Sequence, residues 1–325
     1  MKSVQFDRRG GLDVIRVVEL PVPEPGPGQV RVKVTACGLN FSDIMIRQGR
    51  YVTDVPFPYQ AGMEFSGVVD ALEDGVRNVK LGEAVFGLSF YGGAMAQYVV
   101  VDAASVNPVP AGVLPAEAAA LQIQGITALF CVEDYGRVQN GETVVVHSAA
   151  GGLGGLAVQI AIARGARVMG TASRDEKLRQ IRDLGAEAIN YANGDWVAEV
   201  KKLTSGRGAD VIIDGVGGEL FRRSVFEATT HGGRIVISGV ASAQEVGLTN
   251  FQISAAHRTL IGVSLPSFFP DHIDRILSAM HRLFGMMGKG QLRVRIGHDL
   301  PLEKAVEAFR LLEERSSVGK VVVRP

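Results

Sequence analysis

The sequence predicts an α/β protein in which a doubly wound parallel sheet is joined to a second, β-rich domain. Three observations predict it. Short β-branched runs dominate the first third of the chain, strand-like and helix-like segments alternate after Ala116, and an apolar run ending at His147 leads into a glycine-rich turn. At 325 residues and 46% hydrophobic content, the chain exceeds one ordinary core and has enough apolar material for two.

The pattern of residues in the first third of the chain predicts β structure. Residues 29–35 alternate apolar and polar side chains with period two, and residues 67–69 and 98–101 are short β-branched runs. The proline- and glycine-rich stretch 21–28 excludes a helix or a central strand, so we expect a surface connection there. From Ala116 an alanine-rich helix is expected.

The second region alternates between strands and helices, which predicts a parallel sheet with right-handed crossovers. The expected strands are residues 143–147, 167–171, 188–191, 210–214, 234–238 and 259–264. Towards the end of the chain, residues 271–284 and 303–315 have helical periodicity, and residues 292–296 and 320–323 are strand-like.

The glycine-rich turn has the spacing Ala149-x-Gly151-x-x-Gly154, between a β-branched run and a helical segment. Small residues at this spacing allow a tight turn and a close approach of the backbone to a diphosphate, which the amides of a helix N-terminus attract. Gly151, Gly152 and Leu153 are therefore candidate cofactor-binding residues. The alternative is a turn that only packs tightly.

About twenty residues beyond this turn, an NAD-binding protein places an acidic residue on the ribose 2′-hydroxyl. Here the strand ends in Ser173 and Arg174, with Lys177 one helical turn later. A hydroxyl and two cations are suited to a 2′-phosphate, which an acid would repel, so the sequence favours NADPH. The neighbouring Asp175 leaves a solvated, charged helix start as the alternative.

Charge and cysteine content exclude several classes of function. The 34 basic and 34 acidic side chains cancel, which argues against a nucleic-acid or membrane partner and leaves a small-molecule substrate. Cys37 and Cys131 are too few for a disulfide framework or a four-cysteine zinc site, and we expect them to be small buried hydrophobes. The charged start of the sequence and the absence of long apolar stretches predict a cytoplasmic protein.

Ten motifs in order along the chain resemble the zinc-independent quinone oxidoreductase (zeta-crystallin-like) branch of the medium-chain dehydrogenases/reductases, which includes polyketide enoyl-reductase domains. They are residues 36–43, 48–51, 62–69, 118–121, 125–128, 146–154, 170–173, 189–191, 214–218 and 319–323. The resemblance implies a GroES-like β-barrel catalytic domain (1–122 and 287–325), a Rossmann NADPH-binding domain (123–286), and an active site in the cleft between them. It also implies a homodimer that pairs through the edge strand near residues 259–265.

Asn40 and Met63 occupy the places where alcohol dehydrogenases of this superfamily have a zinc-binding Cys and His. A neutral amide and a thioether are not normal zinc ligands, so no metal is expected. The acceptor should then be activated by conjugation: a quinone or the C=C bond of an α,β-unsaturated carbonyl. Two alternatives stay open, an enoyl-thioester reductase acting on acyl-CoA or acyl-carrier protein, and a non-catalytic NADPH-binding protein.

The resemblance also implies roles for individual residues. It places Asn40 and Asp43 beside the nicotinamide, with Asp43 as an organiser; Tyr51 over the substrate; and Thr127 near the nicotinamide ribose or the substrate. Tyr51 is the candidate proton donor, with a packing aromatic as the alternative and solvent as another proton source. The remaining cofactor residues that it implies are Tyr191 at the adenosine phosphate, and Gly239, Val240 and Arg315 nearer the pyrophosphate or nicotinamide.

The sequence leaves the substrate open. Residues 264–270, with Tyr51, Phe57 and Phe90, either line an apolar cleft or fill the core. An acyl-CoA would need basic contacts, for which the candidates are Arg47, Arg50 and Arg258, although loop arginines are usually solvated. The histidines at 147, 231 and 257 have no ligand spacing and are expected to be structural.

Overall fold

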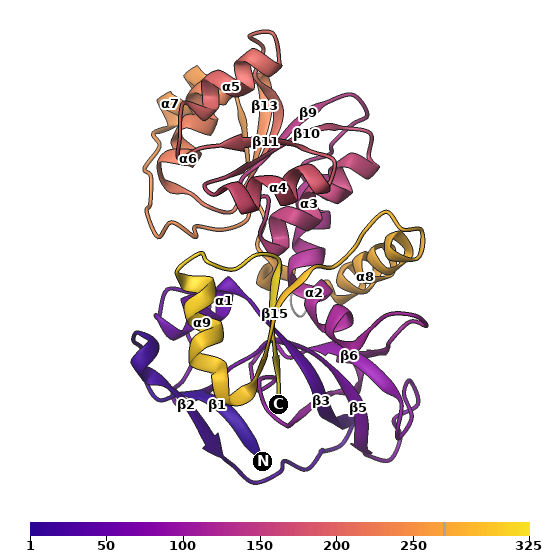
Figure 1. The fold of residues 1–325 in the computed structure, drawn as a ribbon. Helices are drawn as coiled ribbons and strands as arrows, with labels where there is room; N and C mark the ends of the chain where they lie inside the picture. Colours follow the sequence, from indigo (N-terminus) through magenta and orange to yellow (C-terminus); the bar gives the residue numbers. More distant parts are fainter. Residues whose placement is uncertain (269–270) are drawn as a thin grey trace. The chain divides into compact units, whose positions relative to one another are not determined.

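The structure, a computed structural model, describes residues 1–268 and 271–325, and it forms two compact units (Figure 1). The first contains Met1–Ile123 and Val294–Pro325, and the second contains Gln124–Arg293. The return to the first unit was expected at residue 287 but comes at Val294. One reason is a pair of hydrogen bonds within the second unit: Arg293 N donates to Gln159 Oε1 (2.8 Å), and Gln159 Nε2 donates to Arg293 O (3.1 Å).

The first unit contains two sheets. The smaller is antiparallel, with the order β2 (Ile15–Glu19), β1 (Lys2–Phe6), β4 (Tyr59–Gln60). The larger follows the order β15-β16-β3-β5-β6-β8, with β7 also paired to β3. Its strands are β3 (Gln29–Leu39), β5 (Glu64–Leu72), β6 (Ala84–Leu88), β7 (Tyr98–Asp102), β8 (Val106–Pro108), β15 (Ile296–Pro301) and β16 (Lys320–Arg324).

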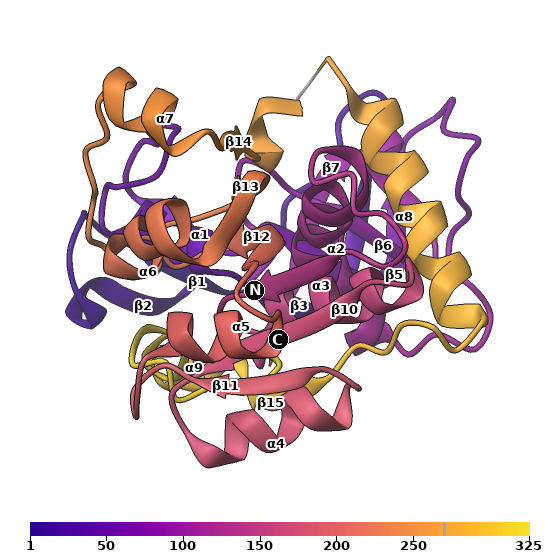
Figure 2. The ribbon, with the colours of Figure 1, turned by 90° about the horizontal axis from the view of Figure 1, so that it is seen from above.

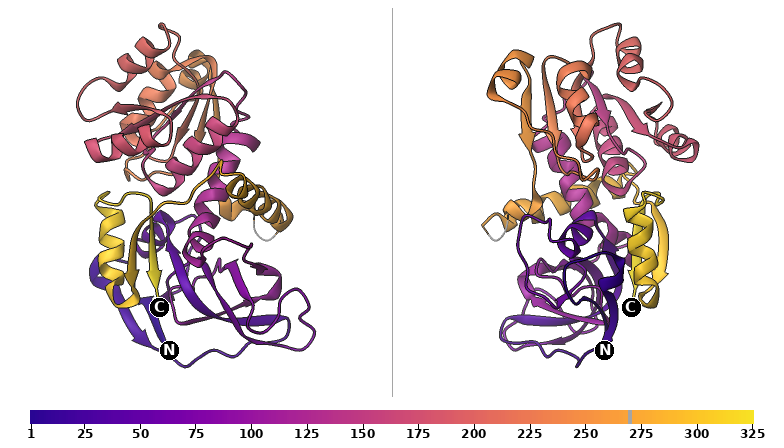
Figure 3. Two further views of the ribbon diagram at one scale, coloured as in Figure 1. Left: turned by 45° about the vertical axis from the view of Figure 1, so that its right-hand side comes forward. Right: turned by 90° about the vertical axis from the view of Figure 1, so that its left-hand side faces the viewer.

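Helices α1 (Phe41–Arg47) and α9 (Ala305–Glu313) complete this unit, and both views of Figure 3 show α9 and the two chain ends within it. Its core includes Phe6 and Phe309, whose fully buried rings meet edge to face at 5.5 Å. The stretch 21–26 is irregular, as its prolines require. The antiparallel pairing of β3 buries alternate side chains over its first half, in agreement with the period-two pattern.

The strand predicted at residues 292–296 is wrong in position. Residues 292–295 are irregular, and β15 begins at Ile296, where it pairs in parallel with Lys320 of β16. The alternating side chains of 292–296 suggested a strand, but the backbone of Arg293 is already bonded to Gln159. The last helix is also shorter than expected, because Leu302–Lys304 forms a 3-10 turn before α9.

The second unit is built on a six-stranded sheet with the order β11-β10-β9-β12-β13-β14, in which every pair is parallel. The strands are β9 (Thr143–Val146), β10 (Arg167–Ala172), β11 (Glu187–Asn190), β12 (Ala209–Asp214), β13 (Thr229–Ile237) and β14 (Thr259–Gly262). Numbered from β9, this is the order 3-2-1-4-5-6 of doubly wound dinucleotide-binding sheets. The predicted doubly wound sheet is confirmed.

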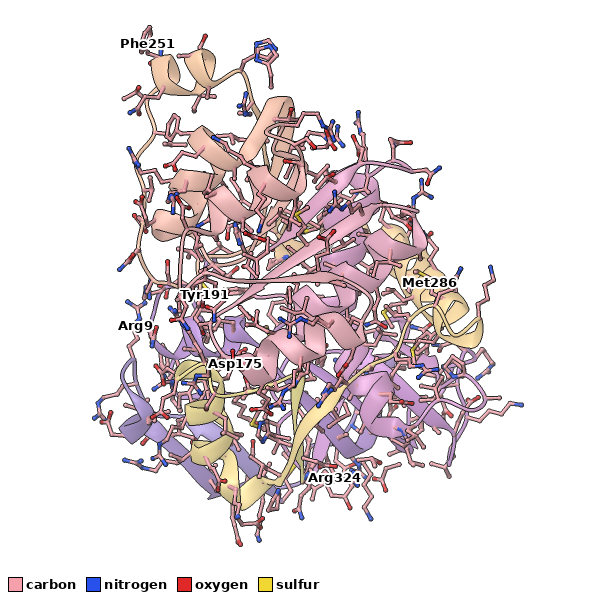
Figure 4. All side chains as sticks on the ribbon, turned by 45° about the horizontal axis from the view of Figure 1, so that its top comes forward. Arg9, Asp175, Tyr191, Phe251, Met286 and Arg324 are labelled. Atoms are coloured by element: carbon pink, nitrogen blue, oxygen red, sulfur yellow. The ribbon has the colours of Figure 1, made fainter. Side chains whose placement is uncertain are left out.

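Helices α3 (Gly152–Ala163) and α4 (Asp175–Asp183) pack against strands β9, β10 and β11, an arrangement that can be followed in Figure 2. The others are α5 (Trp196–Leu203), α6 (Gly218–Arg223), α7 (Asn250–Ala256) and α8 (Ile273–Gly288). Phe251 on α7 is 78% exposed and points away from the ribbon in Figure 4.

Helix α2 (Pro115–Leu129) spans the boundary between the two units and continues as a π-helical turn, Phe130–Asp134. By length and composition alone, Pro115–Asp134 is apolar enough to cross a membrane. However, 72% of its most apolar window is buried inside the structure, as in the core helix of a soluble protein.

Candidate functional site

The glycine-rich turn lies after β9, at the carboxyl edge of the sheet and beside the point where the strand order reverses. Gly151 is the N-cap of α3, and no side chain of the described residues caps that helix. A Cβ on Gly154 would lie 2.3 Å from Ser148 O and 2.8 Å from Ala149 Cα. The helix therefore rests directly on the turn, and its first amides can bind an anion.

Gln124 on α2 lies against the same turn, although no local pattern around it predicted this contact. A Cβ on Gly152 would lie 1.8 Å from Gln124 Oε1. That oxygen is buried and accepts no hydrogen bond from the described residues. The absence of a side chain at position 152 therefore leaves the room that the Gln124 amide occupies.

The residues predicted for a 2′-phosphate come together at the ends of β10 and β11. Ser173 and Arg174 follow β10, and Arg174 is the exposed N-cap residue of α4, which also carries Lys177. The amide of Tyr191 donates to Ala172 O at 3.1 Å, which places Tyr191 beside them. Asp175, labelled with Tyr191 in Figure 4, is exposed in the first turn of α4.

Gly239 and Val240 follow β13, and a Cβ on Gly239 would lie 3.1 Å from Gly215 O in the loop after β12. Asp214 shapes that loop, because its Oδ1 accepts hydrogen bonds from Val216 N (2.6 Å) and Gly217 N (3.0 Å). Ala241 N and Ser242 N donate to Gly215 O (3.0 Å) and Val216 O (2.8 Å), so these two loops at the carboxyl edge of the sheet are held together. Thr127 is buried on α2 in the second unit, whereas Arg315 follows α9 in the first.

A second group of candidate residues lies in the first unit, where α1 begins. Asn40 is the N-cap, and its backbone amide donates to Asp43 Oδ2 at 2.8 Å. Gly62 N donates to Asp43 Oδ1 at 3.3 Å. Asp43 is fully buried, and desolvation raises the pKa of its carboxyl to about 7 despite these two hydrogen bonds. Both oxygens bind backbone amides, in agreement with the organising role predicted for Asp43.

The Asn40 side chain is part of a buried cluster with Glu64 and Lys320, which we call the Lys320 cluster. Lys320 Nζ donates to Asn40 Oδ1 (2.7 Å) and to Glu64 Oε1 (2.5 Å), and Asn40 Nδ2 donates to the same Glu64 oxygen (2.8 Å). Glu64 Oε2 accepts from Ile123 N at 2.7 Å. The three side chains of the cluster are at most 2% exposed. The Asn40 amide is thus bonded within its own unit, and its contact with nicotinamide stays a prediction.

Sequence reasoning missed Glu64 and Lys320 as site residues, although both lie in motifs that carried the resemblance. A signal was present. Lys320 precedes three consecutive valines, a pattern typical of a fully buried strand, and a buried lysine requires a counter-ion.

Tyr51 packs against the core of the first unit and is partly buried. Burial, and secondarily the charge of Asp43, raise the pKa of Tyr51 to about 12, so the phenol is protonated at neutral pH. Burial likewise raises the pKa of Tyr59, whose hydroxyl binds no partner among the described residues. Tyr51 therefore both packs and retains the proton that a donor needs.

The residues at the place of the zinc ligands do not fit a zinc ion. Asn40 Oδ1 already binds an ammonium, and Met63 is 3% exposed within the apolar core. Within residues 1–268 and 271–325, no three His, Cys, Asp or Glu side chains are grouped to hold a metal. An amide, a thioether and an ammonium do not make a zinc donor set.

Two of the arginines considered for acyl-CoA form hydrogen bonds to groups of this chain. Arg47 is fully buried, and its Nη2 donates to both carboxylate oxygens of Glu313 at 2.9 Å. Arg258 donates to the backbone carbonyls of Ala256, His257 and Thr229. The proposed CoA contact is therefore wrong for Arg47, whereas that of Arg258 stays a prediction. Arg50 is exposed and has an interaction of its own.

The apolar segment predicted at 264–270 is partly a core segment, because Leu265 and Phe268 are buried in the second unit. Phe269 and Pro270 lie outside the described residues. Phe57 packs against the core of the first unit, whereas Phe90 is half-buried.

The histidines have structural contacts. The His147 ring nitrogens bind Thr171 Oγ1 and Ser224 Oγ, both at 2.9 Å. His231 and His257 stack in parallel with their ring centroids 4.1 Å apart, a contact that their spacing in the sequence did not predict. Cys37 and Cys131 are buried free thiols, as expected.

Comparison with known proteins places this geometry in a family. Residues 26–111 match the alcohol dehydrogenase GroES-like domain, and residues 152–282 match the zinc-binding dehydrogenase family. The quinone oxidoreductase of Pseudomonas aeruginosa is 32% identical over 100% of this chain and 99% of its own length. The chain belongs to the medium-chain dehydrogenase/reductase family, with the quinone oxidoreductases.

Solved structures of this family share the fold over the whole chain. The Escherichia coli quinone oxidoreductase complexed with NADPH superposes with a TM-score of 0.94 at 27% identity, covering 100% of both chains. A protein described as an NAD-dependent alcohol dehydrogenase has a TM-score of 0.90 at 36% identity, also over 100% of both. The expected GroES-like and Rossmann domains of a medium-chain dehydrogenase/reductase are thereby confirmed.

Proposed function

We propose that this protein is a zinc-independent, NADPH-dependent reductase that transfers hydride to a quinone or to the C=C bond of an α,β-unsaturated carbonyl compound. The observation that carries the proposal is the Lys320 cluster. Asn40 stands at a zinc-ligand position of the metal-dependent members of this superfamily, and here its amide oxygen is bonded to a buried ammonium instead of a Lewis acid that would polarise an alcohol or a simple ketone. An acceptor already activated by conjugation does not need such polarisation.

The turn after β9 is suited to the diphosphate of NADPH, with the uncapped amides of α3 as donors. Ser173, Arg174, Lys177 and Tyr191 would hold the 2′-phosphate, and Gly239, Val240 and Thr127 the nicotinamide half. When bound, NADPH supplies the hydride. When hydride adds to the β-carbon, the C=C pair would shift into the bond between the α-carbon and the carbonyl carbon and the C=O pair onto oxygen, and a proton would convert the resulting enolate to the reduced product.

We assign that proton to the Tyr51 hydroxyl, which remains protonated across the neutral range. Asn40 and Asp43 organise the start of α1 beside it. A small acceptor is favoured over an acyl-CoA, because Arg47 is buried and neutralised by Glu313 and therefore offers no charge to a nucleotide. We further propose a homodimer that pairs through the edge strand β14, which light scattering would test.

The experiment that tests the proposed function follows NADPH oxidation at 340 nm. Benzoquinone, phenanthrenequinone, a simple enone and crotonyl-CoA are the acceptors, with and without a zinc chelator. We expect turnover of a quinone or enone that the chelator leaves unchanged. Turnover of crotonyl-CoA alone would replace the proposal with an enoyl-thioester reductase. Tight NADPH binding without any turnover would favour a non-catalytic NADPH-binding protein.

Cofactor preference should depend on the cluster after β10. Replacing Arg174 and Lys177 together by alanine is expected to weaken NADPH binding by about 10- to 100-fold, because two charge-assisted contacts to the 2′-phosphate are lost at about 1.5–3 kcal/mol each before solvent screening. NADH binding should hardly change. Isothermal titration with both cofactors measures this, with the exposed Arg222 of α6 replaced by alanine as the control. Equal losses for both cofactors would contradict the assignment.

A further inference from the structure

The Lys320 cluster is costly to fold, since an ammonium and a carboxylate must both leave water. Glu64 is completely buried, and the Lys320 side chain is 2% exposed. Lys320 lies at the start of β16, and the next three residues along that strand are buried valines. Because apolar side chains of similar volume often replace a buried ion pair at no cost in stability, stability alone does not explain why a charged pair is present here.

The geometry of the cluster fixes one side chain in one orientation. The ammonium requires an oxygen at 2.7 Å and the carboxylate requires an N–H at 2.8 Å, so the Asn40 amide can point only one way. The backbone of Asn40 then holds Asp43, and Asp43 holds Gly62. A chain of hydrogen bonds thus runs from Lys320 to the first turn of α1.

The segment before α1 is shaped around the same carboxylate. A Cβ on Gly38 would lie 2.2 Å from Glu64 Oε1 and 2.8 Å from Glu64 Cδ. This glycine is therefore needed for Glu64 to reach both Asn40 and Lys320. Residues 38–43 include two of the predicted catalytic residues, Asn40 and Asp43. This segment contacts the ion pair directly at Gly38 and Asn40.

We propose that Lys320, together with Glu64, is a positioning residue that sets the orientation of Asn40 and of the start of α1 for hydride transfer, as a fixed cation bonded to the residue that stands at a zinc-ligand position in metal-dependent members of this superfamily. The inference rests on the proposed function. It assigns a role to the ammonium that an ordinary structural ion pair would not have: the pair can be removed without unfolding the protein, but not without slowing the reaction.

The test compares Lys320→Met with the double variant Lys320→Met/Glu64→Gln. The single variant leaves an unpaired buried carboxylate and should melt at a much lower temperature. The double variant removes both charges and retains an acceptor for Ile123 N, so its melting temperature should return towards that of the wild type. Its kcat should nevertheless stay about 10- to 100-fold low, as for losses of residues that orient a site, with an unchanged dissociation constant for NADPH. Lys304→Met, at an exposed lysine, is the control.

If the double variant regains wild-type kcat together with its stability, the ion pair is only structural and the inference is overturned. If the double variant does not regain stability, Asn40→Leu decides, because it leaves Lys320 and Glu64 paired at 2.5 Å. A folded Asn40→Leu variant with wild-type kcat, or with unchanged hydrogen exchange at residues 38–47, overturns the inference, and one with a 10- to 100-fold loss of kcat and faster exchange of that segment supports it.

Hydrogen exchange separates this inference from the proposed function. Residues 38–47 should exchange faster in the double variant than in the wild type, and unchanged exchange would contradict positioning. If the wild-type protein reduces no acceptor, the proposed function fails, whereas the exchange of residues 38–47 still decides whether Lys320 orders this segment.

Discussion

Replacing Gly154 by alanine should abolish measurable NADPH binding and destabilise the second unit by about 1–3 kcal/mol. The new Cβ would lie 2.3 Å from Ser148 O and 2.8 Å from Ala149 Cα, and these backbone atoms cannot move aside as a flexible side chain would. To relieve the contact, α3 must shift away from the turn after β9. The amides that would bind the diphosphate then lose their alignment. Overpacking of this kind, with the loss of some buried contacts between α3 and the sheet, lowers the free energy of unfolding by about 1–3 kcal/mol.

The chain supplies a matched control one residue away. A Cβ on Gly155 would meet Ala149 O at 3.5 Å and Leu184 Cδ1 at 3.7 Å, which are ordinary contacts. Because alanine favours a helix over glycine by about 1 kcal/mol, Gly155→Ala should be neutral or slightly stabilising. Thermal unfolding and titration with NADPH measure both variants. Equal NADPH affinity in the two would show that the close packing of α3 on the turn is not what prepares the site.

The architecture of the second unit could be predicted from the sequence because the patterns that indicate it are local. A β-branched run, a glycine turn and a helical period follow one another at 143–163, and the parallel order of six strands follows from repeated β/α alternation. Ser173 and Arg174 could be predicted for the same reason, since strand β10 ends just before them. The ends of elements could not be predicted as well, as the late start of β15 shows. There, a backbone hydrogen bond from Arg293 to a distant helix overrides a local alternating pattern.

The first unit was harder to predict, because its important contacts join distant parts of the chain. Lys320 meets Asn40 across 280 positions and Glu64 across 256. Arg47 on α1 is likewise neutralised by Glu313 on α9, which no local pattern near Arg47 indicates. A resemblance can suggest that Asn40 replaces a metal ligand, but it does not show that an ammonium binds the amide. That required the three-dimensional pairing of β16 with β3.

Stability should depend on pH through Asp43. Burial raises the pKa of this carboxyl to about 7 in the folded protein, against 3.8 as its ordinary value, so the native state binds the proton more tightly than the unfolded chain. Its contribution to stability is therefore fully present below pH 3.8 and is lost as pH rises through about 7. The change amounts to a few kcal/mol as an order of magnitude, since each pKa unit corresponds to about 1.4 kcal/mol.

Asp43→Asn removes this titration at the cost of one acceptor for Gly62 N. Its unfolding free energy, measured by urea denaturation between pH 4.5 and 8, should lack the decline that Asp43 gives the wild type, so the two curves approach each other as pH rises. Asp54→Asn, at an exposed carboxyl, should run parallel to the wild type. Parallel curves for Asp43→Asn as well would mean that Asp43 is ionised throughout.

The ionisation of Asp43 should also change kcat. Above pH 7 an ionised Asp43 stabilises the protonated form of Tyr51 and makes that phenol a weaker acid. Wild-type kcat should therefore fall with an apparent pKa near 7 if Tyr51 supplies the proton. A solvent-protonated reaction would show no such step.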